Sequence, residues 1–503
     1  MYICRVMRFS LIALFAYRIV RVQCSIHEVD VAIIGGGLAG LSVAKDLATA
    51  NKSFAILEAR SRVGGRLLNA NFPGGAEELG GEYVGPTQDR VLGLISELGL
   101  KTYKTFTAGD SMYYRNGTLQ RYIDRFGGIP PVGIGSLIEL AGFMNEINTL
   151  ASTINLEEPW NSPNATILDS MTLETFINSR IFTTESRMLL GIVVPGILSV
   201  EAREPSLLYA LWGIAGSGNA TTPGSIGRLI ATDEGAQDSR VIGGSQMLAI
   251  KLAENLGREN IFFNAPVRKV KLEHARYTVT SPTLNISAKH VVVAISPPLA
   301  SRIVFDPPLP AGRAQLNQRM PIGAIGKAIA IFPRPWWRGQ GLNGAGISDT
   351  GAIRVTYDNS PPNVSFGALM GFIEADEMRK LDGASDDEIK LQAKQSFINL
   401  FGSQVDTATE ILIHRWDTDQ FSRGGPAAFM PPEFTSLARK LLSVGSDTWM
   451  ELSAQGNRLL QRSWAISKCF LLGQTYRETF CCVMKCVPIE THLPLLPFWK
   501  LYI

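Results

Sequence analysis

Residues 29–66 read VDVAIIGGGLAGLSVAKDLATANKSFAILEARSRVGGR, and this stretch carries the clearest structural signal in the chain. Val29–Ile34 is an apolar run with β-branched residues, which is typical of a buried parallel strand. Apolar residues then recur at helical spacing from Leu38 to Leu47, and Ser53–Leu57 is a second strand-like run. The pattern predicts a βαβ unit.

Three glycines follow the first predicted strand in G-x-G-x-x-G spacing. Gly35 permits the tight turn, Gly37 lets the backbone approach a pyrophosphate, and Gly40 lets helix and strand pack closely. The free N–H groups at the start of the helix favour phosphate. Glu58 lies 18 residues past Gly40, where a carboxylate can accept hydrogen bonds from a ribose diol.

The fingerprint predicts a dinucleotide site, but it does not separate NAD from FAD. Because the chain contains 48 glycines, a structural glycine turn is the alternative interpretation. The strand before the glycines, the helix after them and the acid at this offset favour the nucleotide.

The residues that follow resemble the second signature of the flavin amine oxidase superfamily. This signature is RSRVGGR, with Arg60, Gly65 and Arg66. In that family the Gly-Gly-Arg turn offers backbone N–H groups and a guanidinium to the FAD pyrophosphate. Residues 78–88, ELGGEYVGPTQ, resemble the monoamine oxidase branch and contain the further candidates Gly80, Gly81 and Tyr83.

The resemblance implies an α/β fold in which an FAD-binding Rossmann-like domain is interleaved with an α+β substrate domain. The expected FAD-binding segments are 28–108, 232–318 and 405–440, and the expected substrate-domain segments are 109–231 and 319–404. A signal peptide is expected at 1–24 and an atypical tail at 441–503.

Two further stretches are assigned by pattern and resemblance. Asn264–Val270 reads as a strand, and the family places the backbone of Val267 against the adenine. His290–Ser296 reads as another buried strand. Gly191–Trp212 resembles one wall of the substrate cavity, although plain core is the simpler interpretation of its apolar residues.

The catalytic candidates implied by the resemblance are Lys327 and Tyr83. Pro321–Lys327, PIGAIGK, resembles the stretch that presents the family's active-site lysine. That lysine holds a water beside flavin N5 and assists the reaction of reduced flavin with oxygen. A surface lysine after a glycine turn is the alternative.

The sequence departs from the family where some members carry a cysteine bonded to FAD and a tyrosine of the substrate cage. Trp416–Pro432 resembles this run but is one residue short, and it offers Gly425-Pro426 or Pro426-Ala427 at that position. We therefore predict non-covalent FAD and an altered cage, with Phe429 as a candidate substitute.

Composition excludes several classes of function. A chain of 503 residues with 46% hydrophobic and 18% charged residues suits a globular protein of two or three domains. The net charge of +3 is too small to suggest nucleic acid or an acidic membrane as the main partner. Five scattered histidines and no zinc-type spacing predict no metal site. The oligomeric state is left open.

The N-terminus suggests secretion. Phe9–Tyr17 is a short apolar core after Arg5 and Arg8, too short to span a bilayer and similar to a signal peptide. Arg18 and Arg21, which follow this core, are unusual in a signal peptide. The alternative is therefore a disordered leader on an intracellular protein. Six N-x-S/T sites support a secreted glycoprotein: Asn51, Asn116, Asn164, Asn219, Asn285 and Asn363.

The tail departs most strongly. Leu441–Ile503 lacks the family's Ala-Gly-Thr-Glu segment and its final flavin-binding helix. Only a faint echo of that helix is present, at Trp449–Glu451 and Gln455–Arg458. It holds three glycines and four of the six cysteines. A frame change or mis-spliced exon near Leu441 is one explanation. A divergent tail, with free or disulfide-bonded cysteines, is the other. The tail contains no run of ~18 apolar residues, so the sequence predicts no membrane anchor there.

By resemblance, the activity is oxidative deamination of a primary or secondary amine, with oxygen reduced to hydrogen peroxide and the imine hydrolysed to an aldehyde. Two alternatives stay open. One is a catalytically impaired product that lacks the C-terminal flavin segment, and the other is an L-amino-acid or polyamine oxidase. An amino-acid oxidase needs an arginine for the substrate carboxylate, and the sequence assigns no position to it.

Overall fold

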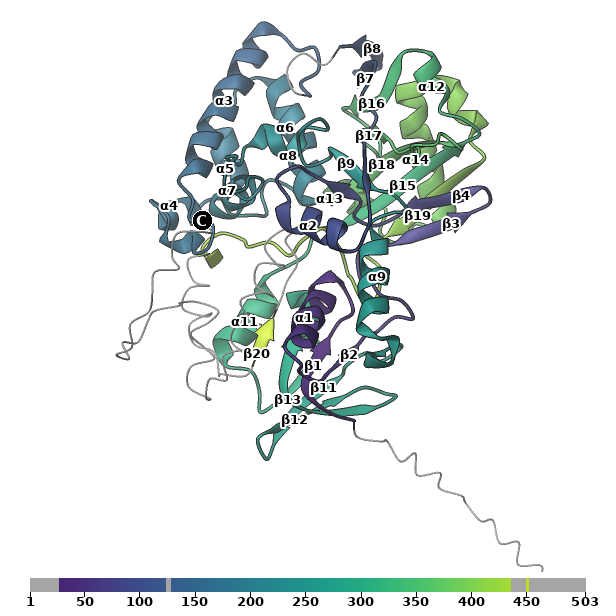
Figure 1. Cartoon of the computed structure of the whole chain (residues 1–503). Helices are drawn as coiled ribbons and strands as arrows, with labels where there is room; N and C mark the ends of the chain where they lie inside the picture. Colours follow the sequence, from purple (N-terminus) through teal and green to yellow (C-terminus); the bar gives the residue numbers. More distant parts are fainter. Residues whose placement is uncertain (1–26, 124–127, 436–448, 452–503) are drawn as a thin grey trace, which may run out of the picture.

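The computed structural model describes residues 27–123, 128–435 and 449–451, in which two large sheets and a helical region are arranged around the centre of the molecule (Figure 1). The predicted signal peptide and all of the atypical tail except residues 449–451 lie outside the described residues.

The first sheet contains the predicted βαβ unit, which the structure confirms. Its strands β10, β2, β1 and β13 run parallel, and β12 and β11 then pair antiparallel before β14 closes the order. The bounds are β1 (His27–Ile34), β2 (Phe54–Leu57), β10 (Ile261–Phe262), β11 (Lys269–Glu273), β12 (Arg276–Thr280), β13 (Asn285–Val293) and β14 (Val304–Asp306).

The two faces of this sheet are buried in different ways. On one face, Val31 and Ile33 of β1 pack against a helical layer, whereas Ala32 and Ile34 belong to a core on the other face. This is the period of two that a strand imposes. The helical layer comprises α1 (Leu38–Thr49), α2 (Asp89–Glu97) and α9 (Gln246–Leu256). Burial on both faces explains why β1 is almost entirely apolar.

The second sheet has the order β19-β15-β18-β17-β16-β7-β8, antiparallel except for β16 with β7. Its bounds are β7 (Asp110–Arg115), β8 (Thr118–Tyr122), β15 (Ile325–Phe332), β16 (Leu342–Ser348), β17 (Val355–Asp358), β18 (Gly367–Glu374) and β19 (Glu410–Arg415). The helices α12 (Trp336–Gly339) and α14 (Asp386–Phe401) cover one face, where Ala328, Ala330 and Phe332 are buried. Lys327 therefore projects from the opposite face of β15.

A helical region lies beside this sheet at the upper left of Figure 1. Its helices bury a separate apolar core with Phe143, Phe176 and Leu211. The bounds are α3 (Ile134–Ser152), α4 (Ala165–Asp169), α5 (Leu173–Asn178), α6 (Thr184–Leu198), α7 (Leu207–Ala215) and α8 (Ile226–Ile230).

Shorter elements connect these layers. Two small sheets are formed by β3 (Asn69–Phe72) with β4 (Gly75–Glu78), and by β9 (Ser239–Val241) between β5 (Tyr83–Val84) and β6 (Thr102–Lys104). The remaining helices are α10 (Pro297–Ala300), α11 (Ala311–Arg319) and α13 (Ala375–Lys380), with 3-10 turns at Pro159–Asn161, Arg258–Asn260 and Gly402–Thr407.

One sequence prediction about a strand is wrong. Asn264–Val270 is not one strand, because β11 begins only at Lys269. Asn264 has a left-handed backbone with φ of 52°, and Pro266 has no N–H to donate to a ladder. Trp449–Glu451, part of the faint echo of the missing helix, forms strand β20, which pairs with β13.

The domain boundaries stay predictions, but strand pairing adds one fact about them. Residues 405–440 were assigned to the FAD-binding domain, yet β19 within this segment pairs with β15 of the second sheet. The chain therefore leaves the second sheet only after Arg415.

Candidate active site

A cavity of about 640 Å³ lies at the carboxyl ends of β1 and β2, which is where open α/β sheets bind ligands. Eleven of the predicted site residues line it: Gly35, Gly37, Glu58, Arg60, Gly65, Arg66, Gly80, Gly81, Tyr83, Val267 and Lys327. Gly40 lies behind the wall, where a Cβ atom would approach the Gly35 oxygen to 2.0 Å. We call this space the cofactor cavity.

The two predicted glycine turns lie against each other in the cofactor cavity. The Gly64 amide donates to the Gly36 oxygen at 2.9 Å, and a Cβ atom on Gly65 would lie 3.5 Å from the Gly37 Cα. Gly35 has φ of 109°, a conformation that favours glycine. Side chains at Gly37 or Gly65 would narrow the cradle that backbone N–H groups offer to phosphates.

Glu58 ends β2 with both carboxylate oxygens held by the backbone. Its Oε2 accepts from the Gly36 amide at 2.7 Å, and its Oε1 accepts from the Arg60 amide at 2.8 Å. Burial raises the pKa of this carboxyl, and the two backbone hydrogen bonds oppose that shift. The carboxyl group is thus oriented at the cavity wall, as binding of a ribose diol requires.

Arg66 supplies a cation to the same cavity. Its Nη1 donates to the Pro426 oxygen, and no carboxylate of the described residues forms an ion pair with it. Burial lowers the pKa of Arg66 to about 10, with the nearby Arg60 adding to the shift. Arg60, in contrast, is paired with Asp419 and also donates to Ser422. A half-buried guanidinium without a counterion among the described residues fits the pyrophosphate of a dinucleotide.

Lys327 lies at the other end of the cofactor cavity and is only 2% exposed. Its Nζ donates to the Glu78 oxygen at 2.7 Å and to the Gly80 oxygen at 3.0 Å, and lies 2.8 Å from Glu82 Oε1. Three oxygens surround the amine, which is the arrangement expected for a charged ammonium. A surface lysine is therefore excluded.

Glu82 belongs to a buried ionic network that the sequence analysis did not identify. The Arg240 guanidinium lies 3.1 Å from Glu77, 2.9 Å from Glu78 and 3.5 Å from Glu82. Burial raises the pKa of Glu77 to about 7 despite the neighbouring Arg240. The three acidic residues within 77–82 were the feature of the sequence that could have indicated this network. Nothing in the sequence linked them to Arg240.

A second cavity, of about 780 Å³, adjoins the first and is mostly apolar. Helices α3, α6 and α7 and strands β16 and β17 contribute to its wall. Four residues line both cavities: Gly196, Ile197, Gln237 and Pro426. We call this space the amine cavity and the shared region the junction. The predicted wall at Gly191–Trp212 does line it, so this stretch is more than plain core.

Aromatic rings lie beside the junction. The ring of Tyr357, in the amine cavity wall, is 5.8 Å from that of Tyr83 and 6.5 Å from that of Phe372. The Tyr83 hydroxyl is buried and has no hydrogen-bond partner among the described residues. Phe429, the predicted cage substitute, lines the amine cavity but not the cofactor cavity.

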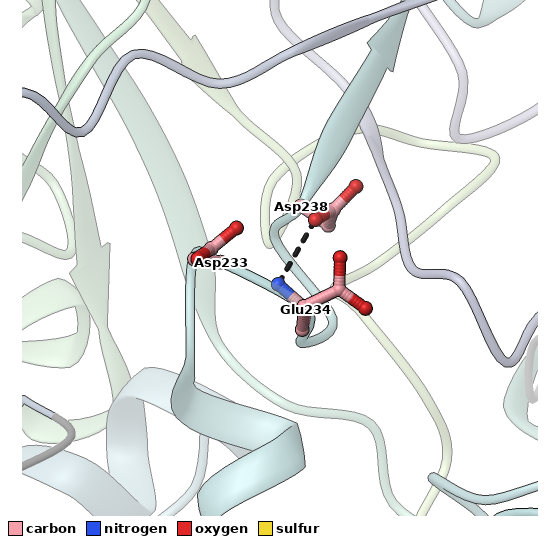
Figure 2. Close-up of side chains that lie close together, drawn as sticks. All are labelled: Asp233, Glu234 and Asp238. Carbon is pink, nitrogen blue, oxygen red and sulfur yellow. Dashed lines mark hydrogen bonds between the residues drawn. The ribbon is translucent and has the colours of Figure 1, made fainter.

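Three acidic side chains gather near the amine cavity, at Asp233, Glu234 and Asp238 (Figure 2). The Glu234 amide donates to Asp238 at 2.9 Å, and Lys104 Nζ lies 3.2 Å from Glu234 and 2.6 Å from Asp238. These partners within the protein account for two of the three carboxylates, so the cluster by itself indicates no metal site.

Comparison with known proteins identifies the family. A family model described as flavin containing amine oxidoreductase matches residues 38–449. The chain belongs to the flavin-containing amine oxidoreductase family. The resemblance seen in the glycine motifs is thereby confirmed, and so are the amine oxidase fold and a flavin-dependent amine oxidase activity in general terms.

Individual relatives agree with this assignment. The chain is 32% identical to a putrescine oxidase of Kocuria rosea over 414 residues, covering 80% of this chain and 84% of the relative. It is 31% identical to amine oxidase [flavin-containing] B of Homo sapiens over 414 residues, covering 81% and 77%. Its structure is similar to cyclohexylamine oxidase from Brevibacterium oxydans, with a TM-score of 0.81, 26% identity and coverage of 88% and 99%.

The cofactor of this family is FAD, and the residues present fit it. The residues that would hold FAD all line the cofactor cavity: the glycine turns and Arg66 for the phosphates, Glu58 for the ribose, and the backbone at Val267 for the adenine. The described residues contain no cysteine, so none of them can form a thioether to the flavin. No helix in this part of the chain is long and apolar enough to cross a bilayer.

Proposed function

We propose that the protein oxidises a small primary or secondary amine with oxygen, giving an aldehyde, hydrogen peroxide and ammonia or a smaller amine. The observation that carries this proposal is the chemistry of the amine cavity. Among the described residues its lining contains no lysine, arginine or histidine, and the acidic groups there are Asp233 and Asp358. Such a wall accepts an uncharged amine, and its described residues offer no cation to a carboxylate.

Asp358 does not alter this chemistry, because it is already neutralised. Its Oδ2 accepts from Trp337 Nε1 at 2.8 Å and from Arg338 Nε at 2.7 Å, and its Oδ1 accepts from Arg338 Nη2 at 2.9 Å. Asp233, in contrast, is exposed at the cavity wall. An exposed carboxylate there can attract a cationic amine toward the cavity.

The protein's part in the reaction is placement and exclusion of water. FAD, when bound, accepts a hydride equivalent from the carbon next to the amine nitrogen. The apolar wall desolvates the amine, and the junction brings its carbon toward the cofactor cavity. Lys327 holds a positive charge beside that cavity through its three oxygen partners. Its predicted role in the reaction with oxygen is part of this proposal.

The lining disfavours one of the two alternatives. An L-amino-acid oxidase needs a cation for the substrate carboxylate, and none lines the amine cavity among the described residues. A polyamine oxidase remains compatible with Asp233. The catalytically impaired product depends on the atypical tail at 441–503, which lies outside the described residues except for 449–451.

A peroxide assay tests the proposal. Purified full-length protein with added FAD is incubated with benzylamine, putrescine and spermine, and with L-leucine and L-phenylalanine. We expect peroxide and aldehyde from at least one amine and at least about a hundredfold lower kcat/KM for the amino acids, because a buried carboxylate would lack a partner. Faster turnover of amino acids would contradict the proposal. FAD-loaded protein that oxidises no amine would favour the impaired product.

A further inference from the structure

Glu374 is a carboxyl group that the mechanism above does not use. It ends β18 and lies opposite Ile325 of β15. Two pairs further along the same two strands, Phe372 lies opposite Lys327. All four residues line the cofactor cavity. Because strand residues two apart share a face, Glu374 and Phe372 point the same way. Glu374 is thus on the same wall as the predicted catalytic lysine.

The Glu374 carboxyl group reaches the junction of the two cavities. Its Oε1 accepts from the Ser199 hydroxyl at 3.4 Å, and its Oε2 lies 3.8 Å from where a Cβ atom on Gly196 would stand. Gly196 and Ile197 line both cavities. A ligand nitrogen that passes from the amine cavity into the cofactor cavity therefore passes this carboxyl group.

Glu374 has no counterion in the described part of the chain. No lysine, arginine or histidine there lies within the 4.0 Å that defines an ion pair to it. Burial raises its pKa to about 8, and the Ser199 hydrogen bond opposes this only weakly. A buried carboxyl group with one weak partner in a cleft is a candidate for function.

The charged groups on neighbouring elements are already engaged. Lys327 on β15 is paired with Glu82. On α13, Asp376 is paired with Arg203 and Arg379, and Glu377 is paired with Arg354 and Lys380. Tyr357 on β17 faces Glu374 as a phenol, because burial raises the pKa of this tyrosine well above its usual range and the Glu374 carboxyl group adds to the shift. Residues 193–198, the last turn of α6, carry no charge.

We propose that the Glu374 carboxylate accepts the excess proton of the amine substrate at the junction. An ammonium N–H bond breaks, a carboxyl O–H bond forms, and the electron pair stays on nitrogen. The products are a neutral amine, which can be oxidised, and a neutral carboxylic acid. Because a buried site penalises both charges, it favours this neutral pair over the ion pair. This inference rests on the proposed amine oxidase function.

The test uses α,α-dimethylbenzylamine, which has no hydrogen on the carbon next to nitrogen and so cannot be oxidised. Its dissociation constant is measured from the change in flavin absorbance between about pH 6 and pH 10. For the wild type we expect a flat value between about pH 8 and the pKa of the amine. Below about pH 8 we expect an increase of about tenfold per pH unit, because Glu374 must then lose a proton first.

The Glu374→Gln variant keeps the size of the side chain but cannot take the proton. As the pH rises from about 8 to the pKa of the amine, the dissociation constant of this variant should keep falling about tenfold per pH unit. Over the same pH range the dissociation constant of the wild type should stay constant. Glu410→Gln, which changes an exposed acid on β19, is the matched control and should follow the wild type.

Three results would overturn the inference. Parallel pH curves for wild type and Glu374→Gln would show that Glu374 does not accept the proton, and would leave the proposed amine oxidase function standing. A change in the flavin spectrum of this variant without amine, with the pH curve unchanged, would make Glu374 a cofactor contact instead. Wild-type protein that binds FAD but shows no amine-induced change at any pH would overturn the proposed function as well.

A measurement on the wild type guards against a variant that does not fold. Calorimetry in two buffers of different ionisation enthalpy counts the protons released when the amine binds. We expect no release at about pH 9 and one proton per amine at about pH 6.5. Release of one proton at pH 9 would overturn the inference.

Discussion

At the scale of single residues, the site depends on charges that are buried together. Lys327, Glu82 and Arg240 form a chain of charges with Glu77 and Glu78 deep in the molecule. Removing one member of such a buried network leaves an uncompensated charge, whereas removing a matched pair does not. The lysine therefore stabilises the fold in addition to its predicted catalytic role.

This leads to a prediction for Lys327→Met. The variant should lower the free energy of unfolding by about 3 kcal/mol, because Glu82 loses its nearest cation. The double variant Lys327→Met with Glu82→Gln should recover part of that loss. Chemical denaturation of the three proteins measures both values. A Lys327→Met protein as stable as the wild type would show that the ion pair contributes nothing.

The sequence predicted the glycines, Glu58, Arg60 and Arg66 because their spacing follows from local backbone geometry. It could not predict Arg240 or Glu374, which reach the site only through long-range pairing. Glu374 reads in sequence as the end of an apolar strand, and Ser199 and Gly196, which lie near it in space, belong to a distant helix.

At the scale of elements, the βαβ unit positions the phosphate cradle. Helix α1 starts directly after Gly37, and Gly40 allows its first turn to lie against the end of β1. The sequence predicted this unit because each part has a periodic pattern. The strand prediction at residues 264–270 failed because it overlooked the backbone requirements of Asn264 and Pro266.

The Gly40→Ala substitution tests the helix packing. The added methyl would stand 2.0 Å from the Gly35 oxygen, so helix and strand must separate. We expect a loss of about 3 kcal/mol in the free energy of unfolding, together with weaker FAD binding. Gly142→Ala on α3, where nothing lies within 4 Å, is the control and should stabilise the protein by about 1 kcal/mol. Equal stability of the two variants would contradict the role of Gly40.

At the scale of the whole molecule, the two sheets and the helical region enclose two adjoining cavities of different chemistry. The cofactor cavity carries glycine turns and buried charges, and the amine cavity is mostly apolar. No local sequence pattern predicts where two cavities meet, so the sequence did not predict the junction. For the same reason it did not predict that Phe429 lines the amine cavity and not the cofactor cavity. Secretion and glycosylation stay predictions, with Asn51, Asn116, Asn164 and Asn363 exposed.

The central claim is that FAD binds non-covalently along the βαβ unit, between two glycine turns. The most direct test is to titrate the purified full-length chain with FAD, remove free cofactor, and then precipitate the protein with acid. We predict a stoichiometric flavin spectrum before precipitation, and colour released to the supernatant afterwards. Folded protein that stays colourless in excess FAD would contradict cofactor binding, and colour retained in the pellet would contradict its non-covalent character.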